Sequence, residues 1–296
     1  MNIIAKSKIW LSIMLVVTLT SIIFFVVFGL KLGIDFTGGS LLEVNFSSQR
    51  PDKEQIEKAL SGLNLGGVLV QPVDEANILL RFKDVDEDTH QRVLESLKSL
   101  SADGGIEELR FESVGPSVGK ELKRRSVYAM VIVLIVIIAY IAWSFRKVSK
   151  PLASWKYGVA AVVALFHDVL LVIGVFSILG RYYGVEVDVA FIAAILTVLG
   201  YSINDTIVVF DRIRENLPRS NEDFAGTVNT SINQTLVRSL NTSITTLLVL
   251  VAIFFFGGDS IHYFVLALII GISAGAYSSI FIASPIVVEW EKMQKK

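Results

Sequence analysis

The sequence contains no cysteine and only three histidines in 296 residues. The missing cysteines exclude disulfide bonds, thiolate metal sites and cysteine nucleophiles. The histidines, His90, His167 and His262, lie far apart in the sequence, which argues against a zinc site. The formal net charge is only −1, so no global electrostatic field points to nucleic acid as a partner. We therefore expect no metal and no cofactor.

Long apolar runs dominate what is present. Hydrophobic residues make up 53% of the chain and the mean hydropathy is +0.61, which is too high for an ordinary soluble domain. A membrane-spanning helix needs about 20 apolar residues. The sequence therefore predicts an α-helical polytopic membrane protein with six transmembrane helices, the first of them a retained anchor. The six runs cover residues 9–30, 127–145, 157–179, 187–210, 240–256 and 261–288.

The Lys and Arg residues of the short loops predict the orientation. A cytoplasmic N-terminus places most of these cations inside, whereas the two short external loops contain only Arg181. The basic cluster at 120–125 argues the other way, but long external domains translocate largely regardless of charge. Both termini are therefore predicted to be cytoplasmic. The cytoplasmic cations would be Lys6, Lys8, Arg146, Lys147, Lys150, Lys156, Arg212, Arg214, Arg219, Arg238, Lys292, Lys295 and Lys296.

Residues 31–125 form a polar segment between the first two spans. Its order β-α-β-β-α-β predicts a ferredoxin-like α+β domain. We expect a transmembrane helix (1–30), this extracytoplasmic domain (31–125) and a five-helix transmembrane domain (126–296). Strands are predicted at 41–46, 68–73, 77–82 and 106–114, and helices at 51–63, starting at Pro51, and 86–100, with a tight turn at 74–77.

The polar domain offers little catalytic chemistry. It has no nucleophile beside a base, no paired carboxylates and no phosphate-binding loop, so a binding or mechanical module is favoured over an enzyme. His90 is expected to be a solvated residue on an exposed helix face.

Two glycine-bearing stretches flank this domain, "GIDFTGGSLLEV" (33–44) and "VGPSVGKEL" (114–122). Both are predicted to be turns, because glycine adopts backbone angles that other residues resist. If the domain moves relative to the membrane, the chain would bend here. The candidate hinge or coupling residues are Asp35, Gly38, Gly39, Gly115, Pro116 and Gly119.

Acidic residues inside the predicted spans are the feature of the sequence with the largest unfavourable free energy of membrane insertion. Asn204 and Asp205 lie within "GYSINDTIVVFDRIREN" (200–216) of the fourth span. A charge at the centre of a membrane helix costs roughly 2.5–3.5 kcal/mol on insertion scales, so Asp205 needs a partner, a water path or a function. His167 and Asp168 lie near the midpoint of the third span, and their side chains should point about 100° apart.

The fifth span, "SINQTLVRSLNTSITT" (231–246), offers a partner for Asp205. Arg238 should enter the membrane at about the depth of Asp205 on the antiparallel helix. Hydroxyls alone would be explained by hydrogen bonding between helices, but together with Asp205 and Arg238 they favour an ion or proton pathway. Spacings of four, three, four and three predict one polar stripe of Ser231, Thr235, Arg238, Thr242 and Thr245.

The sixth span carries small residues at every fourth position, a pattern that lets helices approach closely. We expect a packing face made of Ala267, Gly271, Gly275 and Ser279.

Taken together, these motifs resemble the SecF family, the smaller membrane subunits of the SecD–SecF protein-export complex, within the resistance–nodulation–division superfamily. The likeness rests on "GIDFTGGSLLEV", "VGPSVGKEL", "HD" at 167–168, "GYSINDTIVVFDRIREN" and "INQTLVRSLNTSITT", and it covers nearly the whole chain. Six spans and a single ferredoxin-like domain agree with it.

The resemblance implies a bacterial inner-membrane protein that works with SecD, an obligate partner, beside the SecYEG channel, with YajC and YidC as further candidate partners. Proton flow would drive motions of the external domain that help preproteins emerge on the outer side. It also implies roles for particular residues: Asp205 as proton carrier, Arg238 as its electrostatic switch, Asn204, Thr235 and Thr242 along the pathway, and His167 and Asp168 as a candidate relay.

Two other functions remain open. One is a proton-driven exporter half of the same superfamily that moves lipids or small molecules, and the other is a non-conducting scaffold that steadies a channel. The sequence also leaves open whether the coupling ion is a proton or another cation.

Overall fold

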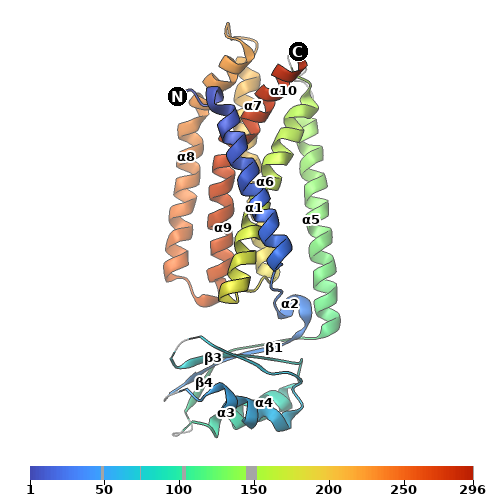
Figure 1. Cartoon of the computed structure of the whole chain (residues 1–296), viewed down its shortest axis with the longest axis vertical. Coiled ribbons are helices and arrows are strands. Elements are labelled where there is room, and N and C mark those ends of the chain that lie inside the picture. The colour runs from blue at the N-terminus through green and yellow to red at the C-terminus, as the bar shows by residue number, and fades with distance from the viewer. Residues whose placement is uncertain (48–49, 74, 102–104, 145–151, 296) are drawn as a thin grey trace. The chain divides into compact units, whose positions relative to one another are not determined.

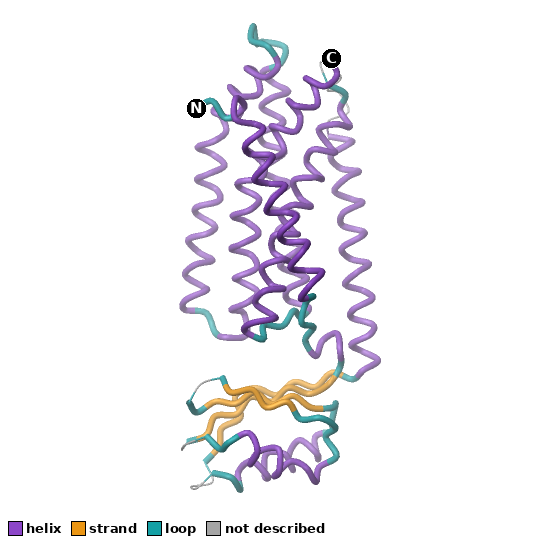
Figure 2. The backbone as a smooth tube through the Cα atoms, viewed as in Figure 1, coloured by secondary structure: helices purple, strands orange, loops and turns teal. Residues whose placement is uncertain are grey.

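The computed structural model describes residues 1–47, 50–73, 75–101, 105–144 and 152–295. The chain forms two compact units, a helical unit made of Met1–Lys31 and Tyr128–Lys296, and a mixed unit, Leu32–Val127, that contains the strands. Figure 1 and Figure 2 show the elements of each unit. Several predicted features lie outside the described residues: residue 145 of the second span, Asp74 of the turn, and the cations Arg146, Lys147, Lys150 and Lys296.

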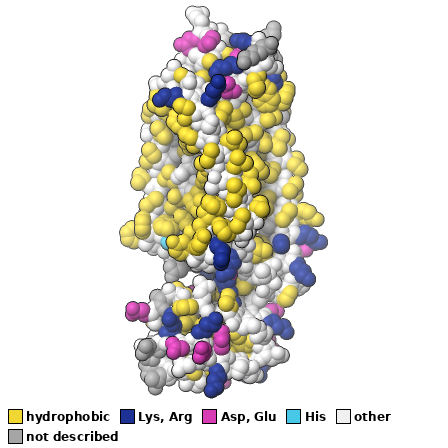
Figure 3. Space-filling view, in the orientation of Figure 1, with side chains coloured by type: hydrophobic (Ala, Val, Ile, Leu, Met, Phe, Trp, Pro, Cys, Tyr) yellow, Lys and Arg dark blue, Asp and Glu magenta, His cyan; other side chains and the backbone are white. Residues whose placement is uncertain are grey.

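Six helices of the described chain are long and apolar enough to span a membrane, which confirms the predicted number. The chain is a multi-pass membrane protein. Apolar side chains cover most of the helical unit on the face seen in Figure 3. The spans are Ile4–Phe28, Pro116–Ile141, Ser154–Tyr183, Val189–Asn216, Phe224–Phe256 and Ser260–Gln294.

The helices extend beyond the apolar runs because polar residues continue and cap them. Asp188 accepts a hydrogen bond from the amide of Phe191, and Asp223 accepts one from the amide of Gly226, which fixes the starts of two helices. The sixth span contains a five-residue π-helical segment, η3 (Ser279–Ala283). The helices are α1 (Ser7–Phe28), α5 (Pro116–Ser144), α6 (Ser154–Tyr183), α7 (Val189–Asn216), α8 (Phe224–Phe256), α9 (Asp259–Ser278) and α10 (Ser284–Gln294).

Small residues bring the helices of the bundle together. Gly275 of α9 lies against Ser202 of α7, where an added Cβ would be 2.8 Å from the serine Cβ. Gly271 contacts Val198 in the same way, one turn away. These contacts confirm the predicted packing face of the sixth span.

The mixed unit is a four-stranded antiparallel sheet in the order β2-β3-β1-β4. This order and the alternation of helices and strands confirm the ferredoxin-like prediction. Helices α3 and α4 cover one face of the sheet (Figure 1), and their side chains share a buried core with those of the strands. The elements are α2 (Ile34–Thr37), β1 (Gly39–Phe46), α3 (Lys53–Leu60), β2 (Leu69–Pro72), β3 (Asn77–Phe82), α4 (Glu87–Lys98) and β4 (Ile106–Val114).

Two local predictions in this unit are wrong. Pro51 does not begin a helix, because Asp52 is the N-cap and its amide donates to the side chain of Gln55, 3.0 Å away. His90 is not solvated but only 4% exposed. Its ring stacks on Phe111 with centroids 3.7 Å apart, and its Nδ1 lies 3.3 Å from the Glu87 carboxylate. Stacking against β4 removes the ring from water while the carboxylate satisfies a ring nitrogen.

The N-cap of α4 gives the mixed unit a dependence on pH. The amide of Thr89 donates to Asp86, and hydrogen bonding to Thr89 holds the pKa of Asp86 below its usual value. A lowered carboxyl pKa means that the cap stabilises the fold above the unfolded-state pKa of about 3.9 and loses this effect as the pH falls through the folded-state pKa. We therefore expect D86A to speed hydrogen exchange of the α4 amides at neutral pH, and the difference from wild type to disappear as the pH falls through the lowered pKa of Asp86. Equal exchange rates at neutral pH would contradict this role.

Candidate functional site

Asp205 lies on α7 and is 3% exposed. Its carboxylate accepts one hydrogen bond among the described residues, from Ser243 Oγ on α8, over 3.3 Å. One turn earlier, the hydroxyls of Tyr201 and Thr246 lie 3.2 Å apart and also join α7 to α8. Asn204 is exposed, so the two adjacent polar residues point in different directions. The acid is therefore buried between two spans with a single weak donor.

The polar stripe of α8 differs from the predicted one. The predicted and observed stripes share Ser231 and Thr235 and then diverge by about 100° around the helix, because one continues at 238 and the other at 239. Arg238, Thr242 and Thr245 are exposed. Packing against α7 and α9, and not the spacing, decides which face of α8 is buried. The buried stripe has a constant spacing of four and consists of Ser231, Thr235, Ser239 and Ser243.

Arg238 does not pair with Asp205 in this structure, since no ion pair or hydrogen bond joins them in the described part of the chain. The hydroxyl of Thr242 donates to the Arg238 carbonyl, 2.9 Å away, and the hydroxyl of Thr235 donates to the carbonyl of Ser231. Of the predicted pathway residues on α8, Thr235 thus lies on the buried face and Arg238 and Thr242 on the exposed face. No continuous chain of hydrogen bonds joins them to Asp205 in the described part of the chain. An Asp205–Arg238 contact that alternates between two states stays a prediction.

Asp168 of α6 lies at the meeting point of three helices and is fully buried. Its Oδ2 accepts hydrogen bonds from Ser202 Oγ of α7, 2.6 Å away, and from Ser278 Oγ of α9, 2.7 Å away. We call Asp168, Ser202 and Ser278 the serine clamp. It joins the third span to the fourth and sixth.

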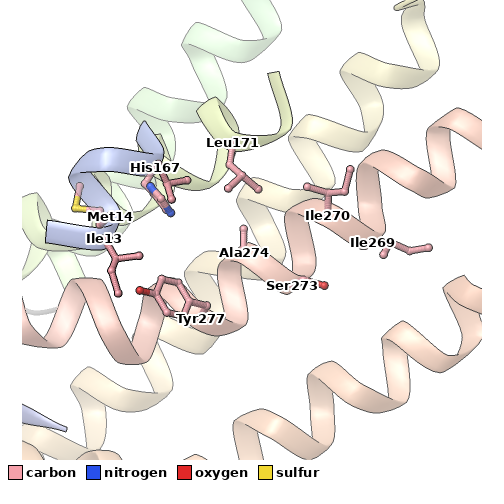
Figure 4. A pocket seen from close by; sticks show the side chains of 10 residues that line it. Ile13, Met14, His167, Leu171, Ile269, Ile270, Ser273, Ala274 and Tyr277 are labelled. Atoms are coloured by element: carbon pink, nitrogen blue, oxygen red, sulfur yellow. The ribbon is translucent and has the colours of Figure 1, made fainter. Parts of the chain in front are cut away.

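His167 faces different surroundings from Asp168. Its Nδ1 lies 2.7 Å from the hydroxyl of Thr18 on α1. It lines a mainly apolar cavity of about 440 Å³ between α1, α6 and α9, together with Tyr277 and Met14 (Figure 4). The adjacent acid and imidazole therefore serve separate helix contacts, as their 100° separation predicts. Their role as a relay stays a prediction.

The two glycine-bearing stretches pack against each other within the mixed unit. The first contains the short helix α2, and in the second, α5 already begins at Pro116, so a turn was predicted where most of the stretch is helical. Gly38 has φ +75°, and an added Cβ would lie 2.8 Å from the Cα of Pro116. A Cβ on Gly119 would lie 3.0 Å from the amide nitrogen of Gly38 and 3.4 Å from the carbonyl oxygen of Asp35. We call the contact of Gly38, Pro116 and Gly119 the glycine joint.

The other candidate hinge residues lie beside this joint. Gly39 has φ +127°, and an added Cβ would lie 2.9 Å from the carbonyl oxygen of Phe82. Gly115 separates β4 from α5. Their role in coupling stays a prediction.

The hydroxyl partners of Asp168 and Asp205, which are Ser202, Ser243 and Ser278, were not predicted from the sequence. A signal was available for Ser243, because Ser231, Thr235, Ser239 and Ser243 recur every fourth residue. No spacing rule links Ser278 to Asp168, since they are 110 residues apart. No cluster of three or more metal-ligating side chains occurs within the described ranges.

The chain matches two family models. Residues 93–293 match "Protein export membrane protein SecD/SecF, C-terminal", and residues 23–49, which include Gly38 and Gly39, match the "SecD/SecF GG Motif". A Thermobaculum terrenum protein named protein translocase subunit SecF is 44% identical over 94% of this chain and 90% of its own length. A Haemophilus influenzae protein of the same name is 40% identical, over 91% and 79% of the two chains.

Solved structures agree with these matches. The crystal structure of SecDF, a translocon-associated membrane protein from Thermus thermophilus, superposes with a TM-score of 0.82 at 33% identity over 99% of this chain. SecDF in its super-membrane-facing form gives a TM-score of 0.70 at 35% identity. This chain spans 39% of the length of each SecDF chain.

The glycine joint makes a testable prediction about stability. We expect G38A to destabilise the mixed unit by about 1–3 kcal/mol for the backbone conformation, and further through the contact with Pro116. Gly66 provides a matched control in the same unit, because it has φ +72° and an added Cβ would meet only an ordinary contact, with the Lys83 Cβ at 3.7 Å. Hydrogen exchange of the β1 amides in the full chain should therefore accelerate more in G38A than in G66A. Equal acceleration in both variants would show that the contact with Pro116 is unimportant.

Proposed function

Because this chain belongs to the SecF family of protein translocase subunits, we propose that it works with a SecD subunit beside the SecYEG channel and uses the proton-motive force to promote preprotein translocation and release. The observation that carries the proposal is Asp205, an acid buried between two membrane spans with one hydroxyl donor at 3.3 Å. A carboxylate that is so poorly solvated is costly to keep ionised, and a protein that retains one has a use for its change of charge.

The exposed face of α8 supports a SecD partner. Arg238, Thr242 and Thr245 are exposed in this chain although they lie in a membrane span. Polar side chains that face lipid are unfavourable, so we propose that SecD covers this face. The related SecDF protein carries both halves in one chain, of which this chain spans 39%. SecYEG, YajC and YidC are further proposed partners, and the substrate is an unfolded preprotein.

The coupling of proton uptake to helix motion would use two charged side chains on neighbouring helices, Asp205 on α7 and Arg238 on α8. In the state described here, Asp205 is bonded to Ser243 and Arg238 is exposed. Rotation of α8 would bring the guanidinium toward Asp205 and favour its ionised form, and the reverse rotation would favour proton uptake. The glycine joint, which lies where α5 meets the strands, would carry this motion to the mixed unit.

The basic loops support an orientation in the bacterial cytoplasmic membrane with both termini inside and the mixed unit outside. In this orientation the mixed unit meets preprotein as it emerges, and the subunit acts as a transport device rather than as an enzyme. The coupling ion we propose is the proton.

Replacement of Asp205 tests the proposal. D205N keeps the shape of the side chain and removes its titration. In vesicles that contain this chain, SecD and SecYEG, we expect D205N to assemble normally but to lose the acceleration of preprotein release that a proton gradient produces. D211N is the matched control, because Asp211 lies on the same helix but is half-exposed and paired with Arg214 at 2.7 Å. It should respond to the gradient like wild type.

Other outcomes would favour the other functions. A full gradient response in D205N would place the proton path elsewhere and refute the role of Asp205. A loss of release that always accompanies loss of the complex would favour a scaffold. Gradient-driven movement of a lipid-like dye that D205N abolishes, with preprotein release unchanged, would favour an exporter of small molecules.

A further inference from the structure

The serine clamp holds the helix that carries Asp205. Ser202 lies three residues before Asp205 on α7, both side chains are buried, and the hydroxyl of Thr206 donates to the Ser202 carbonyl at 3.3 Å. A displacement of Ser202 must therefore also displace the turn of α7 that presents Asp205 to Ser243.

The other arm of the clamp ends at an irregular part of the sixth span. Ser278 is the last residue of α9, and the π-helical segment η3 follows directly. The hydroxyl of Ser284 donates to the carbonyl of Ser279, five residues back, over 3.1 Å. Single π-helical turns within α-helices are rare and are frequent at functional sites. Asp168 thus fixes the end of the regular helix at the point where its geometry changes.

The contact between α7 and α9 depends on close approach as well as on the clamp. Gly275 lies against Ser202 itself, so the serine that bonds Asp168 also fills the space left by the glycine. A shift at either serine would open this contact. The carboxylate is therefore placed to set the distance between the two helices.

The bonding of Asp168 is one-sided. Oδ2 receives both hydroxyls, whereas Oδ1 is buried and has no hydrogen-bond partner in the described part of the chain. A buried oxygen without a donor is costly, so packing alone does not explain an acid at this position. Val, Leu or Ala at 168 would fill space without this cost.

We propose that Asp168 is a positioning residue for proton coupling: through Ser202 and Ser278 it fixes α7 against α9 and thereby sets the placement of Asp205. The inference rests on the proposed function for its consequence, but its structural part can be tested separately. This role requires an oxygen atom at position 168 that accepts hydrogen bonds from both serines. Asn provides such an oxygen and Leu does not, so D168N should preserve the contact between the helices better than D168L.

The absence of cysteine makes a direct test possible. A Cβ on Gly271 would lie 3.0 Å from the Cβ of Val198, which is about half an ångström inside the range of about 3.5–4.5 Å found in disulfides, so a small adjustment of the two helices brings the cysteines into bonding geometry. In the full chain with V198C/G271C, co-assembled with SecD and SecYEG, we expect D168L to slow disulfide formation by about tenfold, which corresponds to about 1.4 kcal/mol. S202A/S278A should slow it similarly, and it serves as the second variant if D168L does not assemble. D168N should stay close to the parent.

Function provides the second readout. Without the cysteines, S202A/S278A should shift the pH at which gradient-driven preprotein release is half-maximal, because Asp205 is displaced. S177A is the matched control, since Ser177 is equally buried on α6 but its hydroxyl donates to a carbonyl of its own helix, that of Ile173. It should change neither the cross-linking rate nor the pH profile.

The outcomes are decisive in both directions. Unchanged cross-linking in D168L and in S202A/S278A overturns the proposal. D168N as defective as D168L in release, with normal cross-linking, also overturns it and makes Asp168 a proton carrier itself. Slowed cross-linking together with a gradient response that D205N does not affect keeps the clamp and refutes the proposed function of Asp205.

Discussion

Hydrocarbon offers no hydrogen-bond partner to a carboxylate, and this constraint governs the helical unit. Three acids of the described spans are buried. Glu291 pairs with Lys295 at 2.6 Å, whereas no cation pairs with Asp168 or Asp205 in the described part of the chain, so neighbouring helices must solvate these two. Each solution uses serine hydroxyls from another helix: Ser202 and Ser278 for Asp168, and Ser243 for Asp205. The acids therefore determine which helix faces meet, and α7 takes part in both contacts.

Hydroxyls can reach a carboxylate only if the helix backbones come close, which explains the glycines. Gly271 and Gly275 remove the side chains that would separate α9 from α7. Glycines also allow a close approach in the mixed unit, where Gly38 leaves room for Pro116 and Gly119 leaves room for the backbone of Gly38. In both units a glycine contact lies next to a residue that we propose to act in coupling. Close approach therefore makes these contacts sensitive to small displacements, since a tightly packed interface switches between discrete arrangements instead of deforming smoothly.

The number of spans and the order of strands could be predicted from the sequence, because both follow from local periodicity. The strands β3 and β4 occupy the predicted residues, whereas α4 begins one residue later than predicted, after its cap Asp86, and ends two residues earlier, at Lys98. The buried face of α8 could not be predicted, because two polar stripes share Ser231 and Thr235 and the helices that pack against α8, mainly α7 and α9, select between them. His90 was misjudged for a similar reason, since the ring that buries it, Phe111, belongs to a distant strand. Local sequence periodicity identifies the helices and strands, whereas contacts between residues distant in the sequence decide which of their side chains are buried.

Asp168 accepts two hydrogen bonds and Asp205 accepts one, and this difference indicates that the two acids have different roles. Asp168 has two short hydrogen bonds from two helices, so moving either helix breaks a strong contact of a fully buried group. Asp205 has one long hydrogen bond from one helix, and the exposed Arg238 lies one face away on that same helix. In the motion we propose, rotation of α8 together with the reach of the Arg238 side chain along the helix would exchange Ser243 for the guanidinium, and the serine clamp contains no residue of α8. The firmly held acid would then keep α7 in place while the loosely held acid changes partners, as the proposed coupling of protonation to helix motion needs.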